Sequence, residues 1–418
     1  MNHIPPHWRW ATLDQLRADE PRAITDGPFG SNLTSAHYTD SGPRVVRLQN
    51  IGDGVFVDAR AHISSEHFEN LRSHAVLPGD LLIASLGESP PRACIAPSWL
   101  GPAIVKADCI RARLSRKVDT RWVLYALQAP MTRRWAADRT HGVGRPRLGL
   151  KTIRAIPIPL PPLDEQRRIV EILEDHLSRL DAAATGLAGA RRLLGVAERV
   201  VVREALAAAG GEPVEIEGLA RSVRNGIFVS RPRPTGGGVP ILRISAVRAL
   251  RLDVTDIRYS ERSEADLAAE DSLLRAGDLL FTRYNGNARF VGACAVVPAE
   301  APPLTYPDKL IRVVVDRSRV LPDFLALACT VGQGRAQIQR RVKTTSGQAG
   351  ISGRDLRGVS VSVPPLRTQE AVLRRVGECR RAFDRLEPAL ESAVRRGAHL
   401  RQGLLDSAFG GSLCSGAV

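Results

Sequence analysis

The amino-acid sequence predicts an α+β protein built from two similar halves, each a mixed α/β domain followed by one long α-helix. Three observations predict this fold. Short motifs recur in the same order in both halves, strand and helix patterns mix without a regular βαβ rhythm, and an apolar heptad pattern follows each mixed segment. We expect the two long helices to pair as an antiparallel coiled coil with pseudo-twofold symmetry.

The internal repeat is carried by four pairs of short motifs. Their spacing grows steadily along the chain, through 196, 198, 201 and 203 residues. A growing offset is typical of a duplicated unit that has accepted loop insertions, whereas chance matches would scatter. In chain order the pairs are Val45–Leu48 with Ile241–Ile244, Gly79–Leu82 with Gly277–Leu280, Ile110-Arg111 with Ile311-Arg312, and Pro161–Gln166 with Pro364–Gln369.

Each mixed segment shows the same succession of elements. Strand patterns come first, a helical pattern follows, and a short strand leads into the Pro-Pro-Leu motif. The predicted ranges are 44–51, 80–86, 120–138 and 153–160 in the first half, and 240–247, 278–283, 322–341 and 356–363 in the second.

The helices after the two Pro-Pro-Leu motifs carry apolar residues at alternating spacings of four and three, which is the seam of a coiled coil. Pro388 is expected to kink the second helix, and Gly210-Gly211 and Gly410-Gly411 to end the two helices. The alternative is two separate helices, each packed on its own domain. The predicted interface residues are Ile169, Leu173, Leu180, Leu187, Leu194, Val372, Val376, Phe383, Leu386 and Leu390.

Composition narrows the class of protein. A chain of 418 residues exceeds what one core usually serves, and 44% apolar content is ordinary for a globular protein. It holds no run of about 18 uncharged apolar residues, and its first residues lack a signal-peptide core, so we expect a cytoplasmic location. Six widely spaced cysteines without a CxxC pair argue against a zinc ribbon and suggest reduced thiols.

The net charge of +15 is concentrated on the mixed segments. Residues 1–163 hold 21 basic and 14 acidic side chains, and residues 209–366 hold 22 and 16. Such a balance is typical of a phosphate-binding surface. Because the chain has 54 arginines and only five lysines, a solubility surface encoded by an arginine-favouring genome explains the charge equally well.

No catalytic or metal-binding motif is evident in the sequence. It lacks the Asn/Asp-Pro-Pro-Tyr/Phe tetrad of adenine methyltransferases and the Gly-x4-Gly-Lys-Ser/Thr phosphate loop. Pro307-Asp308-Lys309 begins like a nuclease motif, but the acidic-x-Lys pair is missing. His62, His67 and His74 fit no metal template and are better interpreted as surface residues. We therefore expect no cofactor in this chain.

Candidate DNA-reading residues lie in loops rich in Arg, Asn, Gln, Gly and Ser. Arginine can pair with guanine through two hydrogen bonds, and Asn or Gln with adenine. The alternative is turn-forming loops whose arginines pair with nearby acids, and a buried ion pair is nearly as good an interpretation for Arg47 and Arg243. The candidates are Ser31, Asn32, Arg47, Gln49, Asn50, Arg145, Arg147, Arg243, Ser245, Arg283, Tyr284, Asn285, Asn287, Arg289, Lys343, Thr344, Ser346 and Gln348.

The motifs resemble those of the specificity (S, HsdS) subunits of type I restriction-modification systems, over essentially the whole chain. Residues 26–33 and 42–51 look like the first recognition domain of that family, 156–170 like its central conserved region, and 278–287 like its second domain. One departure is Arg367-Thr368, which stands where acidic residues are expected before the second glutamine.

The resemblance implies a non-catalytic subunit with target recognition domains at 1–160 and 210–363, long helices at 161–209 and 364–411, and a tail at 412–418. Each domain would read one half of an asymmetric bipartite double-stranded DNA target, and the helices would set the spacer. Two methyltransferase (modification) subunits that use S-adenosylmethionine would dock on the chain. A restriction subunit, an ATP-dependent translocase and nuclease that needs Mg²⁺, could join them.

Two alternatives remain at this point. The chain could be the specificity subunit of a methylation-only or type II-like system, because that difference lies in the partners. It could also be a protein-interaction scaffold in which the coiled coil is the functional part and the basic domains bind acidic proteins or RNA. Sequence-selective, salt-dependent binding of duplex DNA by the assembled complex separates the last reading from the others.

Overall fold

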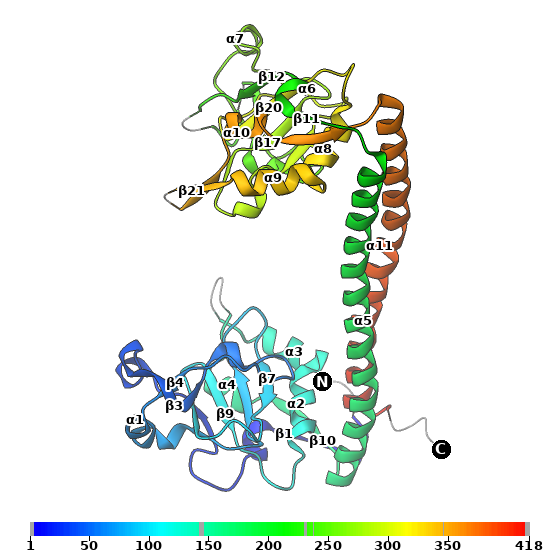
Figure 1. Cartoon of the computed structure of the whole chain (residues 1–418). Coiled ribbons are helices and arrows are strands. Elements are labelled where there is room, and N and C mark those ends of the chain that lie inside the picture. Colours follow the sequence, from blue (N-terminus) through cyan, green and yellow to red (C-terminus); the bar gives the residue numbers. More distant parts are fainter. Residues whose placement is uncertain (1–3, 142–145, 230–231, 237, 346, 414–418) are drawn as a thin grey trace. The chain divides into compact units, whose positions relative to one another are not determined.

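The computed structural model divides the chain into two compact units, and it describes residues 4–141, 146–229, 232–236, 238–345 and 347–413. Unit 1 comprises Met1–Leu187 and Glu391–Val418, and unit 2 comprises Ala188–Leu390. Each unit therefore contains one mixed domain, the first part of one long helix and the last part of the other (Figure 1).

The mixed domain of unit 1 is built on two four-stranded sheets, with strand orders β2-β9-β6-β7 and β4-β3-β8-β5, and on the antiparallel pair β1-β10. Its strands are β1 Arg9–Thr12, β2 Ile24–Asp26, β3 Tyr38–Val46, β4 His62–Ile63, β5 Ala75–Val76, β6 Leu81–Ala84, β7 Arg92–Ile95, β8 Ala103–Val105, β9 Cys109–Ala112 and β10 Pro157–Leu160. Its helices are α1 Ser65–Asn70, α2 Thr120–Gln128, α3 Pro130–Ala137 and α4 Leu150–Arg154, with short 3-10 turns at 13–16, 30–32, 35–37, 48–50 and 72–74.

Unit 2 has a four-stranded sheet of order β12-β20-β17-β19, a three-stranded sheet of order β18-β22-β21, and the pairs β11-β23, β13-β16 and β14-β15. Its strands are β11 Glu212–Glu215, β12 Ala220–Asn225, β13 Pro240–Leu242, β14 Val247–Arg248, β15 Arg251–Leu252, β16 Ile257–Tyr259, β17 Leu279–Thr282, β18 Tyr284–Asn285, β19 Cys294–Val296, β20 Leu310–Val315, β21 Lys343–Thr345, β22 Gln348–Gly350 and β23 Ser360–Val363. Its short helices are α6 Ile216–Leu219, α7 Glu264–Ala269, α8 Pro322–Thr330, α9 Gln333–Arg341 and α10 Gly353–Arg357, with 3-10 turns at 244–246 and 288–290.

The two mixed domains are built in the same way, as the repeat predicts. The order β12-β20-β17-β19 reproduces β2-β9-β6-β7, with each strand in the corresponding place. Single hydrogen bonds also correspond: the Leu13 amide donates to the Ile156 carbonyl at 3.0 Å, and the Ile216 amide donates to the Val359 carbonyl at 2.9 Å. Both members of the second pair lie 203 residues after those of the first, so the duplication reaches individual backbone contacts.

A glutamine explains the Pro-Pro-Leu-x-x-Gln motif. Gln166 accepts a hydrogen bond from the Asp119 amide, at the start of α2, and donates to the Pro161 carbonyl. Gln369 accepts from the Leu321 amide, at the start of α8, and donates to the carbonyls of Pro364 and Arg319. The side chains of both glutamines are buried. Each glutamine thus ties the first turn of a long helix to the capping residue just before a short helix of the same domain.

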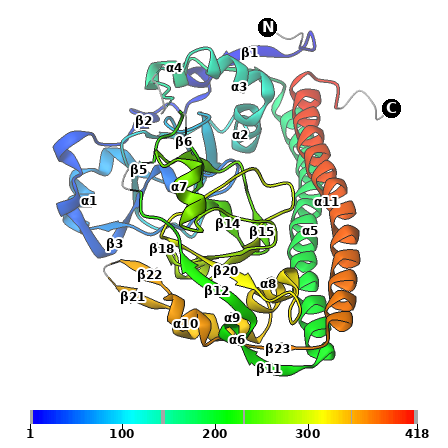
Figure 2. The same ribbon diagram turned by 90° about the horizontal axis from the view of Figure 1, so that it is seen from above.

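The long helices span α5 Leu163–Ala209 and α11 Leu366–Phe409, and they lie side by side (Figures 1 and 2). In unit 2, Arg191 pairs with Glu387 at 2.6 Å and Glu198 with Arg380 at 2.8 Å. The partner number falls as the α5 number rises, so the helices run antiparallel, as predicted. In unit 1, Arg401 of α11 pairs with Asp181 of α5.

The helix ends agree with the sequence prediction, and the kink expected at Pro388 stays a prediction. Gly210, Gly211 and Gly411 have positive φ directly after the last helical residues. A side chain at Gly211 would meet the Val363 carbonyl carbon at 2.4 Å, so the chain can leave α5 along β23 only with glycine there. α11 continues as one helix through Pro388.

The predicted seam residues are buried most deeply near the ends of the helices. Ile169 and Leu173 join the unit 1 core together with Phe409, and Val372 and Val376 join the unit 2 core together with Val202. Leu180, Leu187, Leu194, Phe383 and Leu390 are half-buried. Leu386 is 49% exposed and is the least covered of the predicted interface residues.

Several predicted elements are shorter than their patterns. The predicted helices 120–138 and 322–341 are each two helices. The first is divided at Pro130, which cannot donate a backbone hydrogen bond, and the second at Gly332, which is extended (φ −84°, ψ −159°). The predicted strand 44–51 ends at Val46 and continues as a 3-10 turn, and 153–160 begins with the end of α4.

Candidate nucleic-acid interface

A hairpin before the last short helix occupies corresponding places in the two mixed domains. In unit 2, β21 and β22 form the hairpin, and β22 also pairs with β18, so that Gly350 lies between Lys343 and Tyr284. In unit 1, Arg147 makes antiparallel bridges with His141 on one side and Leu86 on the other. Both hairpins carry predicted DNA-reading residues, and Arg145 and Ser346 lie outside the described residues.

A hollow of about 660 Å³ beside the unit 2 hairpin gathers several of those residues. Its walls come from the loop after β13, from β16, from β18, from β22 and from the loop before β20. Of the predicted set, the lining includes Arg243, Ser245, Tyr284, Asn285 and Gln348. The fold thus brings together side chains that are separated by up to about a hundred positions in the sequence.

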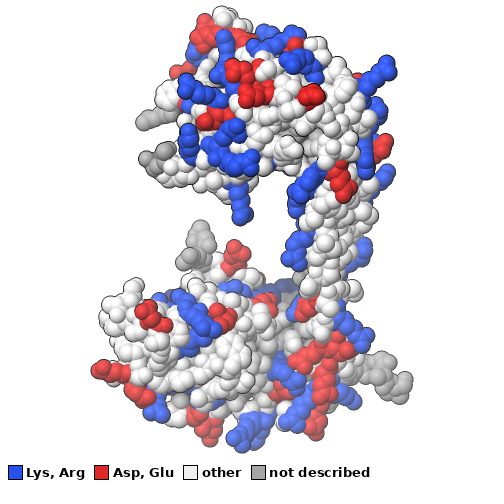
Figure 3. Space-filling model, in the orientation of Figure 1, with Lys and Arg blue, Asp and Glu red and all other residues white. Residues whose placement is uncertain are grey.

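The hollow is basic. Arg248, Arg258 and Lys309 line it together with Arg243, against a single acidic residue, Asp308. Figure 3 shows Lys and Arg side chains gathered over the mixed domain of unit 2, with some Asp and Glu side chains between them. Such an arrangement attracts a polyanion and offers several donors to phosphates and base edges.

The individual contacts show which of these side chains are held in place. Arg243 pairs with Asp256 at 3.1 Å and remains half exposed, so both the ion pair and a free surface are present. Arg283 donates to the Asp308 carbonyl at 3.1 Å, and its guanidinium lies 4.6 Å from the centre of the Tyr284 ring. Arg283 therefore contacts two residues that line the hollow, Asp308 and Tyr284.

The other predicted residues of unit 2 lie around this wall. The Asn285 side chain accepts from the Asn287 amide, and that of Asn287 accepts from the Arg289 amide, so the two asparagines shape the turn after β18. Arg289, Lys343 and Thr344 are exposed. The structure therefore separates turn-forming residues from residues with free polar groups.

In unit 1 the side-chain contacts exclude Asn50 as a DNA-reading residue. Asn50 is buried: its side chain accepts from the Arg47 amide and donates to the carbonyls of Val57 and Ala59 at 2.8 Å. Its amide is fully used inside the domain and is unavailable to a base. Arg47 donates to the carbonyls of Ala59 and Arg60 and is half-buried, so it also serves the loop.

The exposed candidates of unit 1 are Ser31, Asn32, Gln49 and Arg147. The Arg147 guanidinium pairs with Asp108 at 2.7 Å and lies 5.7 Å from the centre of the Phe29 ring. Burial raises the pKa of nearby Asp26 to about 6, assisted by the negative charge of Asp108 and opposed by the Gly27 amide and by Arg147.

Corresponding positions carry different charges in the two domains. The Asp108 carbonyl accepts from the Ser85 amide, and the Lys309 carbonyl accepts from the Arg283 amide, which makes Asp108 and Lys309 equivalent. One domain thus presents a carboxylate where the other presents an ammonium group. The two surfaces share their backbone hydrogen bonds and differ in the side chains that this backbone carries.

The sequence prediction missed Arg248, Arg258 and Lys309. Arg248 and Arg258 lie outside the Gly- and Asn-rich loops that contain the predicted residues, and Lys309 belongs to an incomplete nuclease motif. No sequence pattern marks these three residues as a group, because they meet only in the folded domain.

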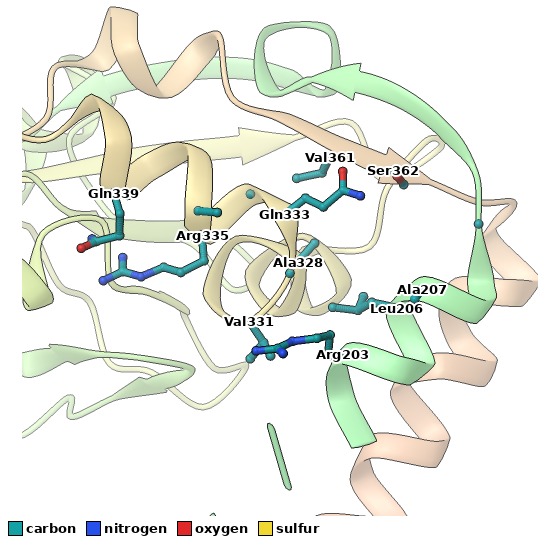
Figure 4. A pocket seen from close by; sticks show the side chains of 14 residues that line it. Arg203, Leu206, Ala207, Ala328, Val331, Gln333, Arg335, Gln339, Val361 and Ser362 are labelled. Atoms are coloured by element: carbon teal, nitrogen blue, oxygen red, sulfur yellow. The ribbon is translucent and has the colours of Figure 1, made fainter. Parts of the chain in front are cut away.

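A second hollow in unit 2, of about 700 Å³, lies between the end of α5 and helices α8 and α9 (Figure 4). Its lining is mainly apolar, with Leu206, Val331 and Val361 prominent. Arg335 is engaged with the carbonyls of Val291 and Arg289. This hollow contains none of the predicted DNA-reading residues.

The described residues contain no group of three or more His, Cys, Asp or Glu side chains that could hold a metal ion. His62, His67 and His74 instead contact the backbone carbonyls of Gly42, Asn32 and Asp26. Cys94, Cys109, Cys294 and Cys329 are free and buried, and burial raises the pKa of Cys94 and of Cys294 to about 12. No described helix has the length and hydropathy needed to cross a membrane.

Comparison with known proteins gives one consistent result. Residues 47–186 match the family model described as type I restriction modification DNA specificity domain. The chain is 36% identical over 272 residues to the type I restriction enzyme EcoKI specificity subunit of Escherichia coli (strain K12), an alignment that covers 62% of this chain and 58% of that subunit. It is 24% identical over 321 residues to the StySPI specificity subunit of Salmonella potsdam, covering 73% of this chain and 68% of the relative.

Solved structures share the fold. A chain from work described as the structural basis underlying complex assembly and conformational transition of the type I R-M system superposes with a TM-score of 0.73 at 18% identity, covering 99% of this chain and 100% of that one. The HsdS subunit of Thermoanaerobacter tengcongensis gives a TM-score of 0.53 at 18% identity, with 98% of each chain covered. The matched residues, the relatives and the shared fold all make this chain similar to the specificity (HsdS) subunits of type I restriction-modification systems.

Proposed function

We propose that each mixed domain reads one half of an asymmetric bipartite DNA target. The observation that carries this proposal is that the two domains have matching backbone hydrogen bonds but different side chains at the corresponding positions. Asp108 and Lys309 occupy equivalent positions, and Leu86 and Tyr284 occupy equivalent positions on the strand beside the hairpin. Two equal readers would recognise a symmetric site, whereas two different readers require two different half-sites.

The roles of the contacts follow from their chemistry. Arg258 and Lys309 would hold phosphates, which positions the duplex without reading its sequence. Tyr284 and Gln348 would face base edges, where the Gln348 amide can recognise adenine through two hydrogen bonds. The hollow of unit 2 gathers both kinds of group, which supports its use as a DNA-binding surface.

We further propose that α5 and α11 set the number of unspecified base pairs between the half-sites. The helices extend for 47 and 44 residues and are joined by antiparallel ion pairs. A paired rod of this kind resists bending and stretching better than an unstructured linker of the same length.

The catalytic chemistry would belong to partners. We propose that two methyltransferase subunits, which bind S-adenosylmethionine, dock on this chain, and that an ATP- and Mg²⁺-dependent restriction subunit joins them. The EcoKI and StySPI relatives are named as subunits of type I restriction enzymes, which supports assembly with such partners.

The test is to express this chain with its methyltransferase in cells that lack other methylation and to sequence the methylated genome. We expect one asymmetric motif of two short half-sites separated by a fixed unspecified gap. The methyltransferase without this chain is the control and should leave no such motif. A continuous short motif, or methylation without sequence preference, would contradict the proposal.

A further inference from the structure

An exposed phenylalanine occupies the same place in both domains. Phe29 follows the last residues of β2, and Phe228 follows the last residues of β12. The preceding strands are equivalent, because Asp26 pairs with Ile110 and Asn225 pairs with Ile311. Phe29 is 49% exposed and Phe228 is 79% exposed. One exposed apolar side chain needs no explanation, but its repetition at equivalent positions of a diverged pair does.

A glycine two residues earlier fixes the loop in each domain. A β-carbon at Gly27 would lie 2.2 Å from the Lys106 carbonyl carbon, and one at Gly226 would lie 2.2 Å from the Tyr306 carbonyl oxygen. Only glycine allows this close approach of two backbone segments. The phenylalanine is therefore presented on a loop that is packed against the neighbouring strand end.

Both phenylalanines adjoin the candidate DNA-binding surfaces. Val229, the residue after Phe228, lines the basic hollow of unit 2. In unit 1 the Arg147 guanidinium lies over the Phe29 ring, and Arg147 belongs to the hairpin that corresponds to the wall of that hollow. In unit 2 the residue that corresponds to Arg147 is Gly350, which leaves more of the Phe228 ring open.

We infer that Phe29 and Phe228 each stack on a DNA base that is exposed when a base step at the half-site opens. This inference rests on the proposed function and deepens it. A phenyl ring has no hydrogen-bonding group and cannot read a base edge. Because the same residue serves two readers with different polar groups, its contact has to be independent of base identity. Stacking meets this requirement, since every base has a π face, whereas contact with a thymine methyl group requires thymine in both half-sites.

The experiment uses the complex of this chain with its methyltransferase and duplexes that contain the methylated motif. 2-Aminopurine, which fluoresces more strongly when unstacked, is placed at successive positions of either half-site. We expect wild-type complex to change the fluorescence at a position in each half-site. Phe29→Ala should abolish the change in one half-site only, Phe228→Ala should abolish it in the other, and each should weaken binding about ten-fold. Phe→Trp at either position should restore both signals.

Trp99→Ala is the matched control. Trp99 is 58% exposed in unit 1 and lies before the start of β8. The Phe29 loop lies at the other end of this strand, where Gly27 contacts the backbone of Lys106. This variant should bind and respond like wild type. If Phe29→Ala and Phe228→Ala also bind DNA and change the fluorescence like wild type, the inference is wrong and the proposed function still stands. The same holds if they impair only assembly with the methyltransferase. Absence of a bipartite motif for the wild-type complex would contradict the proposed function and this inference with it.

Discussion

At the scale of single residues, the difference between Asp26 and its counterpart Asn225 has a consequence for stability. The folded protein binds a proton on Asp26 more tightly than the unfolded chain does, because burial raises its pKa from 3.8 to about 6. The stability contributed by this proton is present below about pH 4 and is lost as the pH rises to about 6. Above that pH the buried carboxylate destabilises unit 1.

Asp26→Asn should therefore stabilise unit 1 by about 1–3 kcal/mol at pH 7.5 and by little at pH 4. An asparagine can still accept the hydrogen bond from the Gly27 amide. Urea unfolding of both proteins across this pH range measures the difference, with exposed Asp40→Asn as the control. A difference that stays constant from pH 4 to pH 7.5 would show that the Asp26 charge is not its source.

The buried glutamines make a second residue-scale prediction. Gln369→Ala leaves the Leu321 amide and the carbonyls of Pro364 and Arg319 without their partner, so it should lower the free energy of unfolding of unit 2 by about 2–3 kcal/mol. Gln369→Glu should be worse, because a buried carboxylate cannot donate to either carbonyl. Exposed Glu370→Ala is the control. Hydrogen exchange localises the effect, and unchanged protection of α8 in Gln369→Ala would contradict this role.

At the scale of elements, the sequence predicts best what local chemistry determines. The ends of α5 and α11 follow from Pro-Pro-Leu and Gly-Gly, and these predictions are confirmed within two residues. The break at Pro130 also has a local cause, because proline cannot donate the backbone hydrogen bond that would continue the helix. The basic hollow could not be predicted in full, because Arg248 and Arg258 meet residues as distant in sequence as Gln348 only in the folded domain. Burial likewise decides the role of Asn50, and burial is a property of the folded domain.

Helix length offers an element-scale test of the spacer proposal. Seven residues inserted after Leu187 in α5 and after Leu390 in α11 lie at the boundary between the units and keep the heptad register. The insertion lengthens each helix by about 10 Å, or about three base pairs. Methylome sequencing should show a gap widened by about that amount and unchanged half-sites. Insertion into α5 alone should abolish methylation, and an unchanged gap after the double insertion would contradict the proposal.

At the scale of the whole molecule, the chain is a duplication in which the two copies share their hydrogen-bonding frame and differ in the side chains on corresponding surfaces. Helices α5 and α11 each run through both units in opposite directions. Each mixed domain therefore packs on the start of one helix and the end of the other. The frame is therefore held by residues that need not change when a half-site changes, which predicts that the domains are separable in specificity.

The central claim is that each domain reads its own half-site, and a domain exchange tests it most directly. Residues 1–160 are replaced by the corresponding domain of a specificity subunit with a different known target, and the methylome is sequenced with the same methyltransferase. We predict a motif in which one half-site is the donor's and the other half-site and the gap are unchanged. A change in both half-sites, or in neither, would contradict the account.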